Sequence, residues 1–120
     1  MDEKLTSLVE GYFDYYSRRN SAEFTKWDAV TDIVMLGGAA AIELVLALVE
    51  GAPGPEALAY VAAGPLEDLL CKHGPFVWKL LAVEARTRPR LRTALGQVWG
   101  GNRMDKSVYA ELRRLYPQRD

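Results

Sequence analysis

The dipeptide Gly-Pro occurs three times at intervals of ten residues, at Gly54-Pro55, Gly64-Pro65 and Gly74-Pro75. Glycine is common just after a helix because it accepts the left-handed conformation, and proline is common at the first helical position, where no N–H is needed. Each pair is therefore interpreted as the end of one helix and the start of the next. The spacing predicts short helices over residues 55–63 and 65–73, followed by a longer helix over about residues 75–87.

The N-terminal third of the chain also shows helical spacing and almost no strand alternation. Its first apolar residues recur at i, i+3, i+4 and i+7, which predicts a helix over residues 3–19 with one apolar face. That face consists of Leu5, Leu8, Val9, Tyr12, Phe13 and Tyr16. Asn20 stands three residues before Glu23, the spacing of a helix cap, and predicts the start of a second helix. The buried side of this second helix is expected to carry Phe24, Trp27, Val30 and Val34.

The segment from Ala39 to Glu50 is apolar nearly all round, which is typical of a central helix. Beyond Pro89, another apolar stripe predicts a seventh helix with Leu91, Ala94, Leu95, Val98 and Trp99 on one side. Asp105 is expected to cap a last helix over residues 105–116. The sequence thus predicts an all-α fold, a single compact bundle of about eight short to medium helices. Its short connections suggest stacked helical hairpins of HEAT-like character.

Composition limits both the organisation and the function of the chain. A length of 120 residues fits one domain over residues 1–120, with a motif-bearing core at residues 21–100 between the two terminal helices. The 15 Lys and Arg nearly balance the 16 Asp and Glu, so no overall field attracts nucleic acid or an acidic membrane. One Cys and one His are too few for a four-ligand zinc site, and no cofactor is predicted.

The N-terminus and the most apolar stretch both argue against export or membrane insertion. The N-terminus is acidic and lacks the apolar core of a signal peptide. Residues 33–49 are the most apolar stretch, but they contain two glycines and carry Glu43 near their centre. Together with the single cysteine, these features favour a cytoplasmic protein without a membrane helix.

Four residues with reactive side chains occur within seven positions: Glu67, Asp68, Cys71 and His73. A carboxylate that orients a histidine beside a thiol would be a catalytic arrangement. On an ideal helix, however, His73 shares a face with the leucines of this segment and points away from both acids. The acids lie in the first turn and His73 in the last, which suits the helix dipole. The group is therefore predicted to be structural, with partner binding by Glu67 and Asp68 as the next interpretation.

The same segment resembles a known family. The resemblance rests on AGPLEDLLCKHG at residues 63–74, with EALAYVAA before it, VEARTRPRLRTALGQVWG after it and the pair Trp27-Asp28 upstream. This pattern is similar to a bacterial family of small all-helical proteins of unknown function that is marked by a Gly-Pro-Leu-Glu-Asp-Leu-Leu motif. The similarity covers about residues 27–100. It implies an all-helical fold and assigns no chemistry, so it transfers no functional residue to this chain.

The only basic cluster is RTRPRLR, which holds Arg86, Arg88, Arg90 and Arg92. Guanidinium groups this close together can bind phosphates or the carboxylates of a protein partner bidentately. A solvated corner between two helices is the favoured interpretation. If the cluster does bind a ligand, an acidic protein surface is expected before nucleic acid, because the chain is slightly acidic overall.

Trp78 lies opposite the apolar stripe of its own helix, which is formed by Phe76, Leu80 and Val83. Either this helix is buried on two sides, or Trp78 is exposed and serves as an anchor for a partner. Burial of Trp78 is the favoured interpretation.

No phosphate-binding loop, metal-ligand spacing, Ser-His-Asp set or dinucleotide motif occurs in the sequence. We therefore expect a non-enzymatic protein that binds another protein. In its most specific form this is an immunity or antitoxin-like protein that neutralises a cognate toxin by direct binding. The alternatives are a structural or adaptor module in a larger complex or homo-oligomer, and a nucleic-acid-binding regulator that uses the corner from Arg86 to Arg92.

Overall fold

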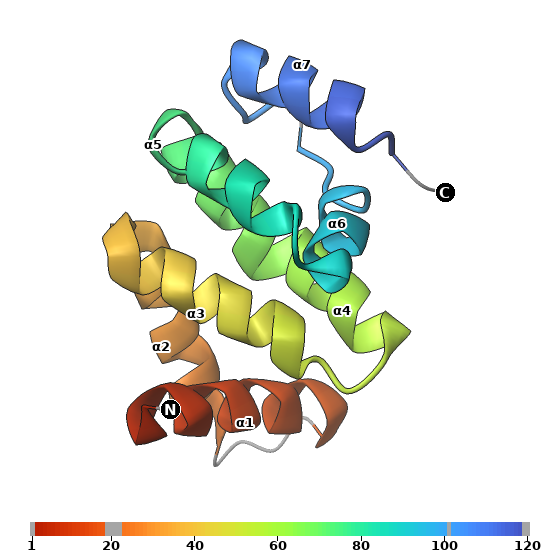
Figure 1. Cartoon of the computed structure of the whole chain (residues 1–120). Coiled ribbons are helices and arrows are strands. Elements are labelled where there is room, and N and C mark those ends of the chain that lie inside the picture. Colours follow the sequence, from red (N-terminus) through yellow and green to blue (C-terminus); the bar gives the residue numbers. More distant parts are fainter. Residues whose placement is uncertain (1, 19–22, 101, 119–120) are drawn as a thin grey trace.

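A computed structural model describes residues 2–18, 23–100 and 102–118 of the chain. Within these ranges every regular element is a helix and no strand occurs. The elements are α1 (Glu3–Arg18), α2 (Phe24–Leu36), α3 (Gly38–Gly51), α4 (Pro55–Val61), the π-helical turn η2 (Ala62–Leu66), α5 (Glu67–Ala85), α6 (Pro89–Leu95) and α7 (Lys106–Leu115). Helices α1, α3, α5 and α7 follow one another from one end of the molecule to the other (Figure 1). The predicted all-α fold is confirmed.

The apolar helix α3 lies at the centre of the molecule. It packs against α1, α2, α4, α5 and α6. Its buried residues are Ala41, Leu44, Val45, Leu48 and Val49. Because α3 has neighbours on most sides, apolar residues nearly all round are stabilising there, as its sequence predicts.

Helix α1 packs against this core through its predicted apolar face. Tyr12 and Phe13 are buried, and the other four members of the face are partly buried against the same cluster. The edge-to-face contact of these two rings, with centroids 5.3 Å apart, adds to their burial. The described part of the helix reaches Arg18, and the predicted boundary at residue 19 lies outside the described residues.

Helix α2 follows the prediction only in part. Val30 and Val34 are buried, as expected. Phe24, by contrast, is 46% exposed and stacks on the ring of Trp27 at the start of the helix. Its ring also meets that of Tyr15 on α1 edge-on, with centroids 5.7 Å apart, and these two contacts leave it partly exposed. The predicted cap, Asn20, lies outside the described residues.

Two of the three Gly-Pro pairs lie inside one helical segment and do not separate helices. Gly54-Pro55 starts α4 as predicted, with Gly54 extended and Pro55 at the first helical position. Helical structure then continues through η2 and α5 to Ala85. Pro65 lies within η2, and Pro75 follows a kink at His73, where φ is −129° and ψ is 18°. The described residues therefore form six continuous helical segments, which corrects the expected eight.

Proline inside a helix removes one backbone hydrogen bond, and its ring clashes with the carbonyl four residues earlier. The widened turn at Pro65 and the kink at His73 relieve these conflicts without ending the helix. The segment stays helical because its leucines are buried on both sides of the first proline, including Leu58, Leu66, Leu69 and Leu70. Burial in the core thus outweighs the local signal for a helix end.

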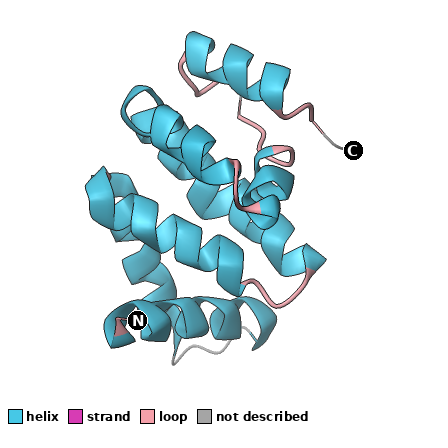
Figure 2. Ribbon diagram, in the orientation of Figure 1, coloured by secondary structure: helices cyan, strands magenta, loops and turns pink. Residues whose placement is uncertain are grey.

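Helix α6 is shorter than the predicted seventh helix. It ends at Leu95, and although Val98 is buried, Trp99 is more than half exposed in the loop that follows. Helix α7 begins behind Asp105, whose carboxylate accepts hydrogen bonds from the backbone N–H groups of Ser107 and Val108 at 3.0 and 3.1 Å. This cap is confirmed. The turns between the other helices are short, as Figure 2 shows.

None of the described helices is both long enough and apolar enough to cross a membrane.

Gly37 separates α2 from α3 in a left-handed conformation, with φ of 77°. A Cβ atom at this position would lie 2.7 Å from Nε2 of His73. The same nitrogen lies 2.8 Å from the carbonyl oxygen of Met35, with which it forms a hydrogen bond. Gly38 has nearly the same φ, 78°, but its Cβ position is open. The two glycines therefore separate the effect of backbone conformation from the effect of the His73 contact.

We predict that Gly38→Ala lowers the free energy of unfolding by about 1 kcal/mol, the strain of the left-handed conformation. Gly37→Ala should lower it by about 2 kcal/mol or more, because the new methyl group also displaces His73 from the end of α2. Gly54→Ala is the control: its backbone is extended and its Cβ position is open, so the change should stay below about 0.5 kcal/mol. Urea denaturation measures all three. Equal losses at Gly37 and Gly38 would contradict the structural role of the His73 contact.

Candidate functional site

The adjacent motif acids have different surroundings. Glu67 is buried, and its carboxylate accepts a hydrogen bond from the backbone N–H of Trp99 at 3.0 Å. The same carboxylate forms an ion pair with Arg103. These contacts join the start of α5 to the loop before α7. These contacts agree with the favoured structural interpretation of Glu67, and they leave its carboxylate inaccessible to a partner, which corrects the alternative that places it on a binding surface.

Asp68 is half-buried and faces a cavity between α1, α2 and the start of α5. Its carboxylate forms no hydrogen bond or ion pair with the part of the chain that the structure describes. Burial raises the pKa of this carboxyl, while the charge of Arg103 acts in the opposite direction and that of Glu67 in the same direction. Asp68 therefore remains a candidate for contact with a ligand.

Cys71 and His73 contact different parts of the molecule. The Sγ atom of Cys71 lies 3.8 Å from the carbonyl oxygen of Gly100, whereas His73 bonds to Met35 at the end of α2. Burial raises the pKa of the Cys71 thiol, which makes it a poor nucleophile at neutral pH. No group of three or more acidic, cysteine or histidine side chains among the described residues could hold a metal ion.

One sequence-based expectation for His73 is wrong. Its side chain was predicted to share the core with the leucines, but it is half-exposed and bonds to the end of a neighbouring helix. The reason is the kink: the backbone of His73 leaves the helical path, so the angle of an ideal helix does not apply there.

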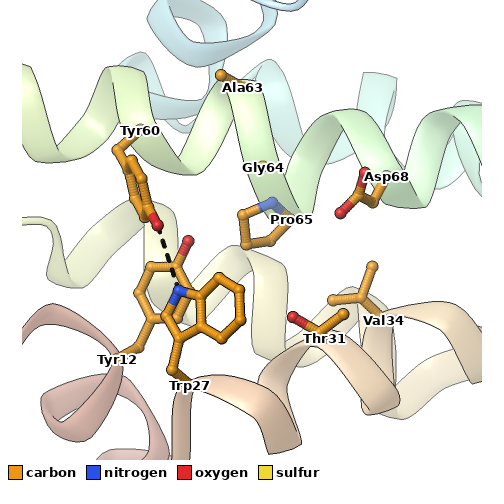
Figure 3. A pocket seen from close by; sticks show the side chains of 9 residues that line it. All are labelled: Tyr12, Trp27, Thr31, Val34, Tyr60, Ala63, Gly64, Pro65 and Asp68. Carbon is orange, nitrogen blue, oxygen red and sulfur yellow. Dashed lines mark hydrogen bonds between the residues drawn. The ribbon is translucent and has the colours of Figure 1, made fainter. Parts of the chain in front are cut away.

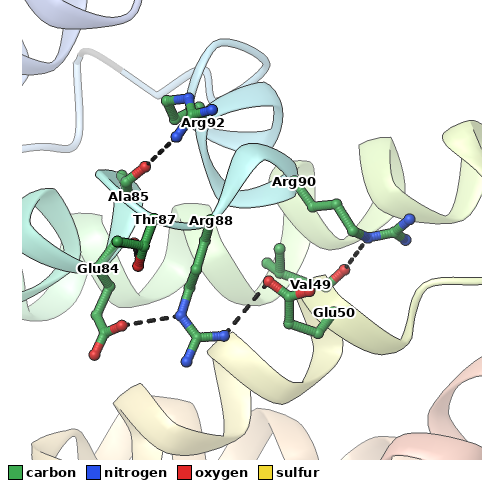
Figure 4. A network of polar contacts seen from close by, with 8 residues as sticks. All are labelled: Val49, Glu50, Glu84, Ala85, Thr87, Arg88, Arg90 and Arg92. Carbon is green, nitrogen blue, oxygen red and sulfur yellow. Dashed lines mark hydrogen bonds and ion pairs between the residues drawn. The ribbon is translucent and has the colours of Figure 1, made fainter.

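The basic cluster forms bonds within the molecule (Figure 4). Arg88 donates a hydrogen bond from Nε to Glu84, one turn earlier on α5, at 2.9 Å. Its guanidinium also reaches Glu50 at the end of α3, at 3.4 Å. Arg88 thus links two helices through a small network of charges.

Arg90 and Arg92 bind the ends of two different helices. Arg90 donates to the carbonyl oxygen of Val49 at 3.0 Å and to that of Ala52. Arg92 donates to the carbonyl oxygen of Ala85 at 2.7 Å. The last carbonyl groups of a helix have no partner within the helix, and they lie at the negative end of its dipole. The two guanidinium groups therefore act as caps for α3 and α5.

Arg86 is the exception in this cluster. Its side chain is exposed and makes no bond to the residues that the structure describes. The expected binding of phosphates or carboxylates by Arg88, Arg90 and Arg92 is therefore not supported by their geometry, because each guanidinium already has partners. Arg86 alone remains available to a ligand.

Trp78 is buried, with 4% of its surface exposed, which confirms the favoured interpretation. Its ring meets that of Tyr116 edge-on, with centroids 6.4 Å apart. The indole N–H has no hydrogen-bond partner within the described ranges. Burial rules out Trp78 as a surface anchor, which corrects its assignment to a partner-binding site.

The stripe opposite Trp78 is exposed, so the expectation that this helix is buried on two sides is wrong. The side chain of Phe76 is 84% exposed, and those of Leu80 and Val83 are each 55% exposed. Lys79 and Arg86 lie on the same side of the helix at helical spacing and are exposed as well. We refer to Phe76, Lys79, Leu80, Val83 and Arg86 as the α5 face.

The end of α2 lies next to the start of the α5 face. The hydrogen bond from His73 to Met35 brings the two helices together one turn before Phe76. Leu36, the last residue of α2, is 83% exposed at this place. Large apolar side chains gathered on a surface and flanked by charged ones are typical of interaction sites. The α5 face is therefore the best candidate for a functional surface.

Comparison with known proteins gives one match. A family model described as "Family of unknown function (DUF6869)" matches residues 16–119. These residues include the Gly-Pro segment, the basic cluster and the whole α5 face. No curated protein and no solved structure matches the chain. The expected bacterial source and the likeness to HEAT-type repeats therefore stay predictions.

We predict that Glu67→Ala lowers the free energy of unfolding by about 1–3 kcal/mol, because it leaves Trp99 N–H and Arg103 without their acceptor. Glu111→Ala removes an exposed carboxylate from α7 and should change stability by less than about 0.5 kcal/mol. Thermal and urea denaturation compare the two variants. If both variants are as stable as the parent chain, the bonds of Glu67 to Trp99 and Arg103 do not stabilise the fold.

A second pair of variants tests the basic cluster. Arg90→Leu should lower the free energy of unfolding by about 1–3 kcal/mol, because the carbonyl groups at the end of α3 lose their donor. Arg86→Leu, in the same cluster, should change it by less than about 0.5 kcal/mol. The same denaturation experiment distinguishes them. Equal effects at both positions would mean that Arg90 does not cap α3.

Proposed function

The chain belongs to this family of unknown function, and we propose that it acts by binding another protein through the α5 face. One observation carries the proposal: Phe76, Leu80 and Val83 are exposed on one side of a helix whose other side is packed into the core. Covering exposed apolar surface contributes roughly 25 cal/mol for each Å² removed from water. A partner that covers this face therefore gains affinity from side chains that contribute little to the fold.

The charges around the α5 face indicate the chemistry of the partner. Lys79 lies among the apolar residues and Arg86 at their end, and neither forms an ion pair with the described residues. A partner surface with an apolar centre and acidic groups at its rim would be complementary to this arrangement. Opposite charges at a rim mainly speed association and exclude wrong partners, while the apolar centre provides the affinity.

The most specific form of the proposal is an immunity or antitoxin-like role, in which the partner is a toxin that the chain neutralises by covering it. A toxin gene directly beside the gene for this chain would support that form. An adaptor or homo-oligomer role uses the same face but predicts a larger complex or a second copy of the chain as the partner. Size-exclusion chromatography with light scattering on the purified chain separates the homo-oligomer from the other forms.

Binding of nucleic acid is the second alternative, and it is less favoured. Three of the four arginines on which it depends donate to groups within the molecule, and only Arg86 is available. A complex with DNA or RNA that forms below micromolar concentration and weakens steeply with added salt would favour this alternative, because phosphate binding releases counterions.

We predict that a photo-reactive benzoylphenylalanine at position 76 cross-links to one partner protein in cells of the native host. The same group at position 24 should not cross-link to that protein. Phe24 is the matched control because it is also an exposed aromatic residue, but it lies at the opposite end of α2 from Leu36. Mass spectrometry identifies the cross-linked protein. The same set of proteins at both positions would contradict a specific site.

A double variant confirms that the cross-link reports binding by this face. Phe76→Asp with Leu80→Asp should abolish co-purification of the cross-linked partner, while Leu115→Asp on α7, also an exposed apolar residue, should leave it unchanged. Both variants should fold because the substituted side chains are at least two-fifths exposed and lie outside the buried core, and circular dichroism checks this. Normal co-purification with the folded double variant would refute the proposal.

A further inference from the structure

A cavity of about 320 Å³ lies on the other half of the long helical segment, away from the α5 face (Figure 3). Rings from three helices form one end of it: Tyr12 of α1, Trp27 of α2 and Tyr60 of α4. Asp68 of α5 lies at the other end, and Pro65 stands between the acid and the rings. The cavity therefore has an aromatic end and an acidic end.

The π turn brings these two ends onto one side of the helical segment. Tyr60 and Asp68 are eight residues apart, which in a regular α-helix would place them about 80° apart around the axis. The π turn η2 accommodates one extra residue. With the extra residue absorbed, the side chains of Tyr60 and Asp68 are spaced like residues seven positions apart in an α-helix. They then point in directions that differ by only about 20° around the helix axis. The π turn that accommodates Pro65 therefore forms one wall of the cavity. Such turns are frequent at functional sites.

The polar groups of the cavity select for positive charge. No Lys, Arg or His is among the described residues that line it. The carboxylate of Asp68 has no partner in the described chain, and Thr31 also lines the cavity (Figure 3). The indole N–H of Trp27 already donates to the hydroxyl oxygen of Tyr60, at 3.3 Å. The other donors that line the cavity are hydroxyl groups, and an anion beside them would be repelled by Asp68. A neutral apolar molecule would cover the acid without pairing with it.

The cation whose charge lowers the pKa of Asp68 is Arg103, which does not line the cavity and pairs with Glu67. Arg103 lines a neighbouring hollow with Cys71 and Lys72, and Asp68 stands between the two spaces because it lines both. Tyr12 contributes no negative charge, because burial raises the pKa of its hydroxyl group far above the physiological range. Asp68 is thus the one charged group that faces the cavity among the residues that line it.

We propose that this cavity binds a primary ammonium group on a short apolar stem. Asp68 pairs with the ammonium group at one end of the cavity, and the rings of Trp27, Tyr60 and Tyr12 enclose the apolar stem at the other end. The volume is at the lower end of the range for small-molecule sites, so it admits a small amine or one lysine side chain and excludes a nucleotide. The inference is independent of the α5 face and goes beyond the proposed function.

The test is a titration of the full chain, followed through the indole N–H signal of Trp27 in ¹H–¹⁵N spectra. The probes are phenethylamine, a lysine residue blocked at both backbone ends, and 2-phenylethanol. Phenethylamine or the blocked lysine should shift the signal in a saturable manner. The alcohol has the same stem without the charge and should bind at least about tenfold more weakly than phenethylamine, because it lacks the charge-assisted hydrogen bond. Saturation by phenethylamine supports a free amine as the ligand, and saturation by the blocked lysine alone supports a partner's side chain.

Two matched variants complete the experiment. Asp68→Asn should weaken binding of the amine at least about tenfold. Asp32→Asn removes the same charge from an exposed position of α2 outside the cavity and should leave the affinity within about twofold. The proposal is overturned if neither amine binds at millimolar concentration, if the alcohol binds as well as phenethylamine, or if the two variants behave alike. Should Asp68→Asn fail to fold, the comparison of amine and alcohol on the parent chain still decides.

Discussion

Pro65 and Pro75 have no backbone N–H group, and this constraint determines the path of the longest helical segment. Both prolines lie in one helical segment, which must widen at the first and kink before the second. The widened turn aligns Tyr60 with Asp68 and forms one wall of the cavity. The kink directs His73 towards the end of α2, where it bonds to Met35 beside Gly37. The cavity and the contact of His73 with the end of α2 thus follow from one covalent property of proline.

Local features of the fold are predictable from the sequence, and features that depend on distant burial are not. The apolar face of α1, the central position of α3 and the Asp105 cap follow from periodicity and capping within a few residues. The three Gly-Pro pairs are locally alike, yet only Gly54-Pro55 starts a helix. At Pro65 the flanking leucines are buried against other helices, and that gain keeps the segment helical. No local pattern reveals which side chains the rest of the chain will cover.

The candidate site shows the same division. Sequence reveals that Arg90 and Glu67 are charged and clustered with other charges, but their partners lie 41 and 32 residues away, at Val49 and Trp99. Partner binding therefore stays open for both in the sequence, whereas the structure shows that both hold helices and loops together. α5 carries apolar residues on two sides, and periodicity cannot say which side lacks a neighbouring helix. The exposed side proved to be that of Phe76, and the buried side that of Trp78.

The two candidate sites differ in how much of the fold they require. The α5 face lies on one helix after the kink, so it persists as long as α5 is packed on the core. The cavity needs Tyr12 from α1, Trp27 from α2 and the π turn together. A ligand that binds only the assembled cavity stabilises the packing of α1 by mass action. Trp27, Tyr60 and Asp68 lie within the residues that the family model matches, whereas Tyr12 precedes them. The acid and two of the three rings therefore lie in the part of the chain that the family model matches, and Tyr12 of α1 adds the third ring from outside that part.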